Sequence, residues 1–205
     1  MEIIKETEVV DNYKIMEDQN RLRFLSFDQN KIISKWNLDA DELEIRFKML
    51  GIDYRLERAT GKVFRGDEPA TVNATMTIYD MFCYSDERPV LANDWVSIEQ
   101  IGGIIATHHV EHLLNDPAMK KYAGKIEELK KACIAMNGTE TKPGDVSYIL
   151  PLFDFFPLWL KFYDADDEFP VSLTFLWDRN ATQFLHYETM WYTMSFVKEE
   201  LEKWL

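Results

Sequence analysis

Cysteine is scarce in this sequence: the 205 residues contain only Cys83 and Cys133. Both lie within apolar patterns of helical spacing, which favours two buried thiols in a reducing compartment over a disulfide. Two thiols also cannot supply the thiolate set that an iron–sulfur cluster needs. We therefore expect neither a disulfide framework nor an iron–sulfur cofactor.

Basic residues are few as well. The chain has 23 Lys and Arg against 36 Asp and Glu, a formal net charge of −13. The densest basic pairs, Lys120-Lys121 and Lys130-Lys131, are diluted by nearby glutamates. Such a surface repels phosphate backbones and anionic lipid headgroups, so the sequence predicts no nucleic-acid partner and no membrane partner.

Long apolar runs are missing too. The most apolar stretch, residues 149–160, is interrupted by Pro151, Asp154 and Pro157 and is too short to span a bilayer. The N-terminus carries charges where an export signal needs an apolar run, so we expect a cytoplasmic protein. With 46% hydrophobic residues, 8 glycines and 7 prolines, the chain is expected to fold around a sizeable core.

Hydrophobic periodicity predicts an α+β fold in one domain. Residues 6–27 have helical spacing, and Asp28 is a candidate N-cap for a helix that ends near Trp36. Apolar and polar residues then alternate through 43–65, which is typical of half-buried strands. Further helices are expected at residues 70–84, 104–114, 117–122 and 124–136, a hairpin from strands at 158–163 and 171–177, and a final helix from about 188.

The expected architecture is an antiparallel sheet, built from the N-terminal meander and the C-terminal hairpin, packed with several helices. We expect a single domain over residues 1–205. Along the chain it consists of N-terminal helices and a meander (1–66), a helical middle (70–138), and the hairpin with the C-terminal helix (145–205). The last helix carries one apolar stripe, which makes a homodimer possible through Met190, Met194, Val197, Leu201 and Trp204.

Several phrases of the C-terminal half resemble a known family. They are Trp95-Val96-Ser97-Ile98-Glu99-Gln100-Ile101-Gly102-Gly103, Gly144-Asp145, Phe156-Pro157-Leu158-Trp159-Leu160, Asp164, Asp167-Glu168-Phe169-Pro170 and Trp177-Asp178. In order and spacing they resemble a family of unknown function from anaerobic bacteria and archaea. The resemblance implies a role in prokaryotic anaerobic metabolism. Some relatives are joined to an iron–sulfur domain of corrinoid and one-carbon metabolism, for which this chain has no spare cysteines.

Three of the four histidines fall within His108-His109-Val110-Glu111-His112. On a helix, His108 and His112 lie one turn apart and can share a Zn²⁺ ion, with Glu111 as a general base. This pattern predicts a metal-dependent hydrolase as one alternative. The competing interpretation is a solvated helix face, because no third ligand is indicated and short motifs occur freely.

The acidic connection of the hairpin is the second candidate site. Four carboxylates in five residues, Asp164, Asp166, Asp167 and Glu168, can hold a hard cation or contact a ligand. The structural alternative is that Asp167 or Glu168 accepts backbone hydrogen bonds that close the turn. Asp178 is either a further ligand-binding residue or the cap of a turn.

No assembled catalytic set is visible, so catalytic residues stay undefined, and we expect no cofactor, with zinc at the histidine cluster as the alternative. The aromatic segments 153–156 and 191–192 are interpreted as core, or as the lining of a pocket for a flat ligand. The leading functional hypothesis is therefore a non-catalytic protein that binds a small ligand or a protein partner in a cleft between sheet and helices.

Overall fold

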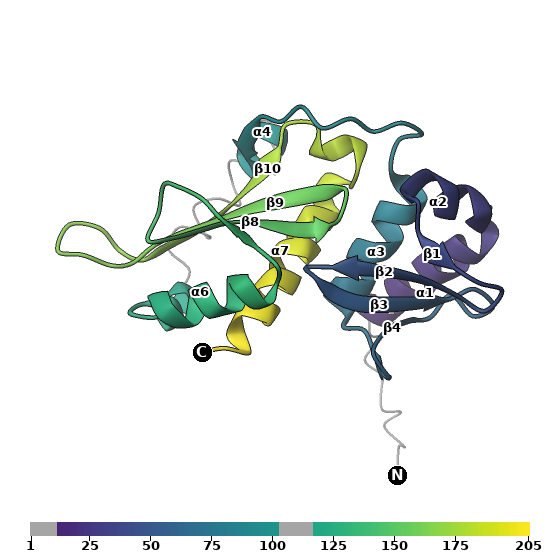
Figure 1. The fold of residues 1–205 in the computed structure, drawn as a ribbon, viewed down its shortest axis with the longest axis horizontal. Coiled ribbons are helices and arrows are strands. Elements are labelled where there is room, and N and C mark those ends of the chain that lie inside the picture. Colours follow the sequence, from purple (N-terminus) through teal and green to yellow (C-terminus); the bar gives the residue numbers. More distant parts are fainter. Residues whose placement is uncertain (1–11, 103–116) are drawn as a thin grey trace, which may run out of the picture.

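The computed structural model describes residues 12–102 and 117–205 (Figure 1). Its first two helices are α1 (Asn12–Ser26) and α2 (Gln29–Trp36). Asp28 caps α2 as the sequence predicts, because its carboxylate accepts hydrogen bonds from the N–H groups of Asn30 and Lys31.

The N-terminal meander follows. Its strands are β1 (Asp39–Ala40), β2 (Glu44–Met49), β3 (Ile52–Glu57), β4 (Val63–Arg65) and β5 (Glu68–Pro69). The register of β2 and β3 pairs Phe47 with Tyr54, and both rings are buried. The neighbouring pair, Arg46 with Arg55, lies on the opposite face, because successive side chains alternate across a strand. The alternation of apolar and polar residues in 43–65 therefore corresponds to strands, as predicted.

Short elements connect the meander to the second half of the chain. They are α3 (Val72–Tyr84), β6 (Trp95–Ser97), α4 (Ile98–Gly102), a 3₁₀ helix (Pro117–Tyr122) and α6 (Ile126–Ala135). The Ser97 N–H donates a hydrogen bond to Gln100 Oε1 at 3.1 Å, which is one half of the capping box proposed for these residues. The helix expected at 104–114 lies outside the described residues.

The C-terminal half contains the predicted hairpin and a strand that periodicity did not reveal. Its elements are β7 (Thr139–Glu140), β8 (Val146–Phe153), β9 (Phe156–Tyr163), β10 (Ser172–Asp178) and α7 (Tyr187–Glu202). β9 and β10 form the hairpin, with Tyr163 opposite Ser172. β8 is the additional strand. It is buried along most of its length and contains Pro151, so it lacks the alternation by which a strand is recognised.

The ten strands of the described residues belong to one open antiparallel sheet, which confirms the α+β single-domain fold. The order is β5-β4-β3-β2-β8-β9-β10-β6, with β1 beside β2 and β7 beside β8. In the part of the chain that the structure describes, the two halves of the sheet pair at the end of β2, where Met49 lies opposite Phe153. Next to this pair, the Leu50 N–H donates to the carbonyl of Pro151 at 2.9 Å.

The turn at this junction has an unusual backbone. Leu50 and Gly51 both have positive φ, +54° and +71°, as a two-residue hairpin turn requires. A side chain at Gly51 would place its Cβ 2.7 Å from the Cβ of Asn137, so this position needs glycine. Leu50 tolerates the conformation because its side chain is completely buried in the core.

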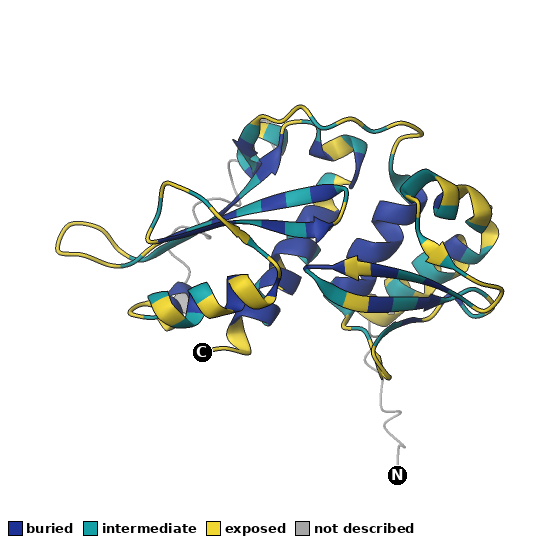
Figure 2. Cartoon of the chain, viewed as in Figure 1, coloured by how far each residue is buried: buried dark blue, intermediate teal, exposed yellow. Residues whose placement is uncertain are grey.

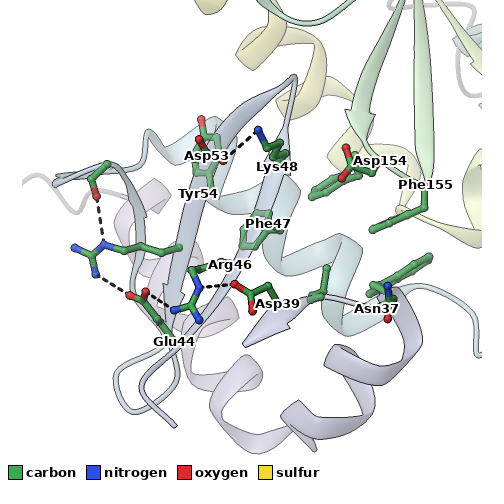
Figure 3. Close-up of a pocket in the computed structure, with 15 residues that line it drawn as sticks. Asn37, Asp39, Glu44, Arg46, Phe47, Lys48, Asp53, Tyr54, Asp154 and Phe155 are labelled. Carbon is green, nitrogen blue, oxygen red and sulfur yellow. Dashed lines mark hydrogen bonds and ion pairs between the residues drawn. The ribbon is translucent and has the colours of Figure 1, made fainter. Parts of the chain in front are cut away.

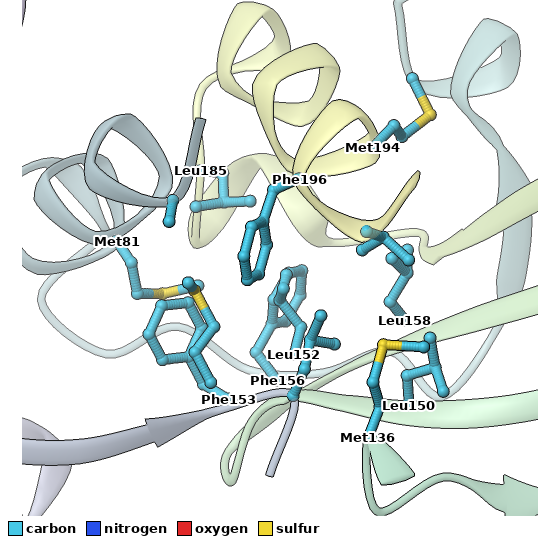
Figure 4. Packing of buried hydrophobic residues seen from close by; sticks show 14 of the residues in the cluster. Met81, Met136, Leu150, Leu152, Phe153, Phe156, Leu158, Leu185, Met194 and Phe196 are labelled. Carbon is cyan, nitrogen blue, oxygen red and sulfur yellow. The ribbon is translucent and has the colours of Figure 1, made fainter. Parts of the chain in front are cut away.

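Helices α3 and α7 cover the sheet and carry much of the core (Figures 1 and 2). In Figure 4, Met81 of α3 and Phe196 of α7 pack toward Phe153 and Phe156 at the β8–β9 turn. The apolar stripe of α7 is used in this core, and only Trp204, beyond the helix, is 45% exposed. No described helix is long and apolar enough to cross a membrane.

A seam of polar contacts sets the register of α3 against α7. The contacts are Asn73 Nδ2 to Glu199 Oε1 at 2.5 Å, Thr77 Oγ1 with Thr193 Oγ1 at 3.1 Å, and Asp80 with His186. Asp80 is 5% exposed, and its two oxygens contact the backbone N and the Nδ1 of His186, each at 2.7 Å. Because buried polar groups are costly when unpaired, these contacts favour the observed alignment of the two helices.

Replacement of Asp80 tests this role. We expect Asp80→Ala to lower the free energy of unfolding by about 2–4 kcal/mol, since it removes both acceptors of His186 from a buried position. Urea unfolding measures the change. Asp86→Ala, which removes an exposed carboxylate just beyond α3, is the matched control. Equal stability of the two variants would show that the pair does not align the helices.

Candidate functional site

A cleft lies where the two halves of the sheet meet (Figure 3). We call it the junction cleft. Residues from β2 and β3, the end of α2 and the β8–β9 turn enclose about 550 Å³, a volume typical of small-molecule sites. The residues that characterise it are Trp36, Arg46, Lys48, Asp53, Asp154 and Phe155.

Three nearly parallel aromatic rings form one wall of the junction cleft. Phe155 stacks on Trp36 with ring centroids 3.8 Å apart and on Phe153 with centroids 5.4 Å apart, each at an interplanar angle of 12°. The column is closed at the Trp36 end by Lys35, whose Nζ lies 4.6 Å from the ring centroid. Stacking of this kind restrains the half-buried turn residue Phe155, so the wall is formed in advance of any ligand.

Arg46 occupies the sheet side of the cleft within a shell of three carboxylates. Its guanidinium donates to Asp39 Oδ2 at 2.6 Å, to Asp41 Oδ2 at 2.8 Å and to Glu44 Oε1 at 2.7 Å. Together with hydrogen bonds from the backbone N–H groups of Leu43 and Glu44, the Arg46 guanidinium lowers the pKa of Asp41 to about 2. Arg46 is therefore fixed in place, and its charge is compensated.

The other charged residues of the cleft differ in how tightly they are held. Arg55 lies over the Phe64 ring, with its Cζ 4.1 Å from the centroid, and donates to the Gly66 carbonyl at 3.3 Å. Lys48 and Asp53 form a looser pair at 3.5 Å, with 53% and 86% of their side chains exposed. Asp154 is exposed and has no hydrogen bond or ion pair within the described part of the chain.

A second, larger cleft of about 840 Å³ lies between the β9–β10 hairpin and α7. We call it the hairpin cleft. Leu173, Phe175, Trp191 and Met194 form apolar parts of its lining, and Asp145, Asp164 and Asp166 lie at its polar side. Glu99 and Met119 also line it, and residues 103–116 between them lie outside the described ranges. Two of the acidic residues singled out in the sequence, Asp164 and Asp166, are thus brought to a cleft between sheet and helix.

The carboxylates of the acidic hairpin loop accept backbone hydrogen bonds. Asp164 accepts from the N–H groups of Gly124, at 2.9 and 3.0 Å, and of Ala165, at 2.8 Å. Asp166 accepts from Glu168 and Phe169 at 2.8 and 2.6 Å, and these bonds lower its pKa. The turn is therefore closed by Asp166, whereas the sequence suggested Asp167 or Glu168 for that task. Asp167 and Glu168 are exposed and line neither cleft.

Asp178 lies apart from the acidic loop. It is 3% exposed, and its carboxylate accepts from the N–H groups of Ala92, Asn93 and Asn180 at 2.9, 2.7 and 2.8 Å. These bonds join the segment before β6 to the end of β10. The turn cap expected from the sequence is present at Asn180, and the contacts with residues 92 and 93 come only from the tertiary structure.

The histidine cluster of the hydrolase alternative, His108, Glu111 and His112, lies outside the described residues. Within 12–102 and 117–205, no group of three or more His, Cys, Asp or Glu side chains is arranged to hold a metal ion. The zinc hypothesis consequently stays a prediction from the sequence.

The sequence patterns did not single out His186. Its Nδ1 faces Asp80, its ring packs edge-on against Tyr84 with centroids 4.6 Å apart, and 54% of its side chain is exposed. This is the arrangement of an oriented imidazole, but neither Asp80 nor His186 lines the junction cleft or the hairpin cleft. A lone histidine before a helix has no motif, so only spatial proximity to Asp80 reveals the pair.

Both thiols are buried and free, as expected. Burial raises the pKa of Cys83 and of Cys133 to about 12, so both stay protonated near neutral pH.

We expect Ellman's reagent at pH 8 to leave both thiols unreacted in the native protein and to label both in urea. Rapid labelling of either thiol in the folded protein would contradict this burial.

The ion pairs of Arg46 predict an acid-dependent contribution to stability. The pKa of Asp41 is lowered from 3.8 to about 2 on folding, so its contribution is present above pH 3.8 and is lost as the pH falls toward 2. We expect Asp41→Asn to flatten the dependence of unfolding free energy on pH between these values, measured by urea unfolding. Asp53→Asn, which removes an exposed carboxylate of the same sheet face, serves as the control. An unchanged slope in Asp41→Asn would argue against the shell around Arg46.

Comparisons with known proteins give one match, which is to a family model. No curated protein and no solved structure matches the chain. A family model described as a domain of unknown function, DUF3786, matches residues 28–199, which include all the described residues of both clefts. The chain therefore belongs to the DUF3786 family of domains of unknown function.

Proposed function

We propose that this protein binds a small organic molecule with a flat apolar part in the junction cleft. The observation that carries the proposal is the stacked column of Trp36, Phe155 and Phe153 beside a cavity of about 550 Å³. Rings that are already ordered lose little conformational freedom when a ligand packs against them. The proposal adopts one of the two interpretations of the aromatic segment 153–156, namely that it lines a pocket for a flat ligand.

The charged residues of the cleft favour binding over chemistry. Arg46 and Arg55 are fixed by their own partners, which suits a role in shaping the cleft. The buried thiols of Cys83 and Cys133 are protonated and lie outside the cleft. We accordingly propose a binding or accessory protein of the prokaryotic cytoplasm in an anaerobic metabolism, with no nucleic acid or membrane as partner. The net charge of −13 disfavours nucleic acid and anionic lipid as partners, the two free, buried thiols suit a reducing compartment, and the anaerobic prokaryotic setting rests on the family resemblance alone.

The junction cleft is preferred to the hairpin cleft for a structural reason. The acidic residues of the hairpin cleft already accept backbone hydrogen bonds that hold the loop, which supports a structural role for Asp164 and Asp166. The junction cleft instead contains two exposed carboxylates that can accept further hydrogen bonds, Asp53 and Asp154, beside an apolar wall. Sites for small molecules commonly combine these two features.

Saturation-transfer NMR tests the proposal with three aromatic probes of different charge: benzyltrimethylammonium, benzenesulfonate and benzyl alcohol. We expect at least one probe to receive saturation from the protein, and its affinity to fall about 3- to 10-fold in Phe155→Ala, because an aromatic contact is worth about 0.5–1.5 kcal/mol. Phe169→Ala, which removes a ring that is 66% exposed on the hairpin loop, is the matched control.

Two results would overturn the proposal. One is the absence of saturation transfer to all three probes. The other is equal binding of a probe by wild type, Phe155→Ala and Phe169→Ala, which would indicate weak contacts over the whole surface. Thermal unfolding of each variant shows whether a loss of binding reflects a loss of fold.

A further inference from the structure

One edge of the sheet is open beside the hairpin cleft. In the described part of the chain, β6 pairs with the end of β10, and the last pair is Ser97 with Leu176. After Ser97 the chain turns into α4, so it does not continue along β10. Residues 172–175 of β10 therefore have β9 on one side and no described strand on the other. We call these residues the free edge.

Two residues of the free edge direct backbone hydrogen-bonding groups away from β9. The Arg179 N–H donates to the Asp94 carbonyl at 2.8 Å, on the side of β6. Because the direction of these groups alternates along an antiparallel strand, Leu173 and Phe175 present their N–H and C=O groups on that same side. Neither residue forms a backbone hydrogen bond there with another described residue. Phe175 is 5% exposed, and backbone groups at buried positions are nearly always paired, so a partner is expected at this edge.

The hairpin cleft runs along the free edge. Its lining includes the six consecutive residues 170–175. Successive side chains of a strand point to opposite faces, so a cavity over one face would contact only every second residue. Consecutive lining residues place the cleft beside the edge itself. Trp191 and Met194 of α7 form another wall, and the result is a groove of about 840 Å³ between a strand edge and a helix.

This geometry suits an extended peptide. A peptide that adds a strand to a sheet edge bonds through its main chain, and its alternate side chains enter pockets on one face. The free edge is about 13 Å long at about 3.3 Å per residue, which matches a peptide segment of about four residues. Apolar side chains of the cleft, among them Leu173 and Met194, can receive those alternate side chains.

The charges of the groove indicate the kind of peptide. Among the described lining residues, four are acidic and one is a lysine: Glu99, Asp145, Asp164, Asp166 and Lys198. The hydrogen bonds that the three aspartates accept from backbone N–H groups fix these carboxylates in place and leave them negative. Such a groove attracts a basic segment. It also repels a second copy of this chain, which would bring the same carboxylates and a net charge of −13.

We infer that the hairpin cleft binds an extended, basic segment of a partner protein, which adds a strand to the free edge of β10. The two clefts share no described lining residue, so this site is independent of the proposed function. Peptide binding therefore does not require a ligand in the junction cleft.

Fluorescence anisotropy of labelled peptides, titrated with the full chain, tests this inference. The probes are Lys-Val-Thr-Val-Thr-Val-Lys and its versions with leucine or phenylalanine in place of valine, and we expect at least one to bind. The peptide that binds best is then N-methylated either at its apolar residues or at its threonines. Because the N–H groups of a strand alternate in direction, only one of these two versions should lose binding, by at least about 5-fold. Replacing both lysines of the peptide by glutamate should weaken binding about 3-fold or more at low ionic strength.

A variant of the free edge tests the same pairing from the side of the protein. Leu173→Pro removes an N–H group that takes no part in the ladder with β9, and proline is tolerated at such edge positions. We expect it to weaken the peptide about 3- to 10-fold relative to Leu173→Ala. Leu173→Ala is the matched control, because it shortens the same side chain and keeps the N–H group. Thermal unfolding shows whether both variants are folded.

Several results would overturn the inference. Absence of binding by all three peptides would show that the edge is closed to a partner. Equal binding of the two N-methylated versions, whether both are weakened or neither is, would exclude main-chain pairing. Tighter binding of the glutamate peptide would reject a basic partner. A dimer in sedimentation velocity that Leu173→Pro dissociates would assign the free edge to a second copy of the chain. The benzyl probes of the junction cleft report on the proposed function separately.

Discussion

The hydrogen bond from Leu50 to the Pro151 carbonyl, beside the Met49–Phe153 pair, is the contact on which the rest of the structure depends. Among the described residues, this bond, the second bond from the Leu50 N–H to the Leu152 carbonyl and the Met49–Phe153 pair connect β2 of the meander to β8. Because β2 ends there, the two halves of the sheet diverge on either side, and the β8–β9 turn reaches the end of α2. The junction cleft and its stacked rings are consequences of this narrow connection.

The same junction requires that the helical layer have one fixed alignment. The core below it combines side chains from α3, α7 and the β8–β9 turn, and apolar packing alone tolerates several arrangements of similar volume. The Thr77–Thr193 and Asp80–His186 contacts remove this ambiguity, since buried polar atoms lose free energy when they are unpaired. The aromatic wall and the charged sheet face are thereby held on a rigid support, which is what a preformed binding cleft needs.

Sequence patterns predicted those elements that depend on interactions between residues near one another in the chain. The alternation in residues 43–65, the N-cap at Asp28 and the hairpin of β9 and β10 all follow from period, capping and turn chemistry. The patterns missed β8, because a strand buried for most of its length shows no alternation. The acidic loop was recognised, but the choice among Asp166, Asp167 and Glu168 as the residue that closes it depends on the backbone path, which composition does not contain.

The sequence by itself determined the α+β class, the acidic charge, the two buried thiols and membership of the DUF3786 family. Only the tertiary structure decided which distant residues meet: Trp36 with Phe155, Asp80 with His186, and Asp178 with the segment before β6. The physical reason is that period and capping act over a few neighbouring residues, whereas these contacts depend on strand order and on how helices pack across the sheet. A cleft built from such contacts has no signature along the chain.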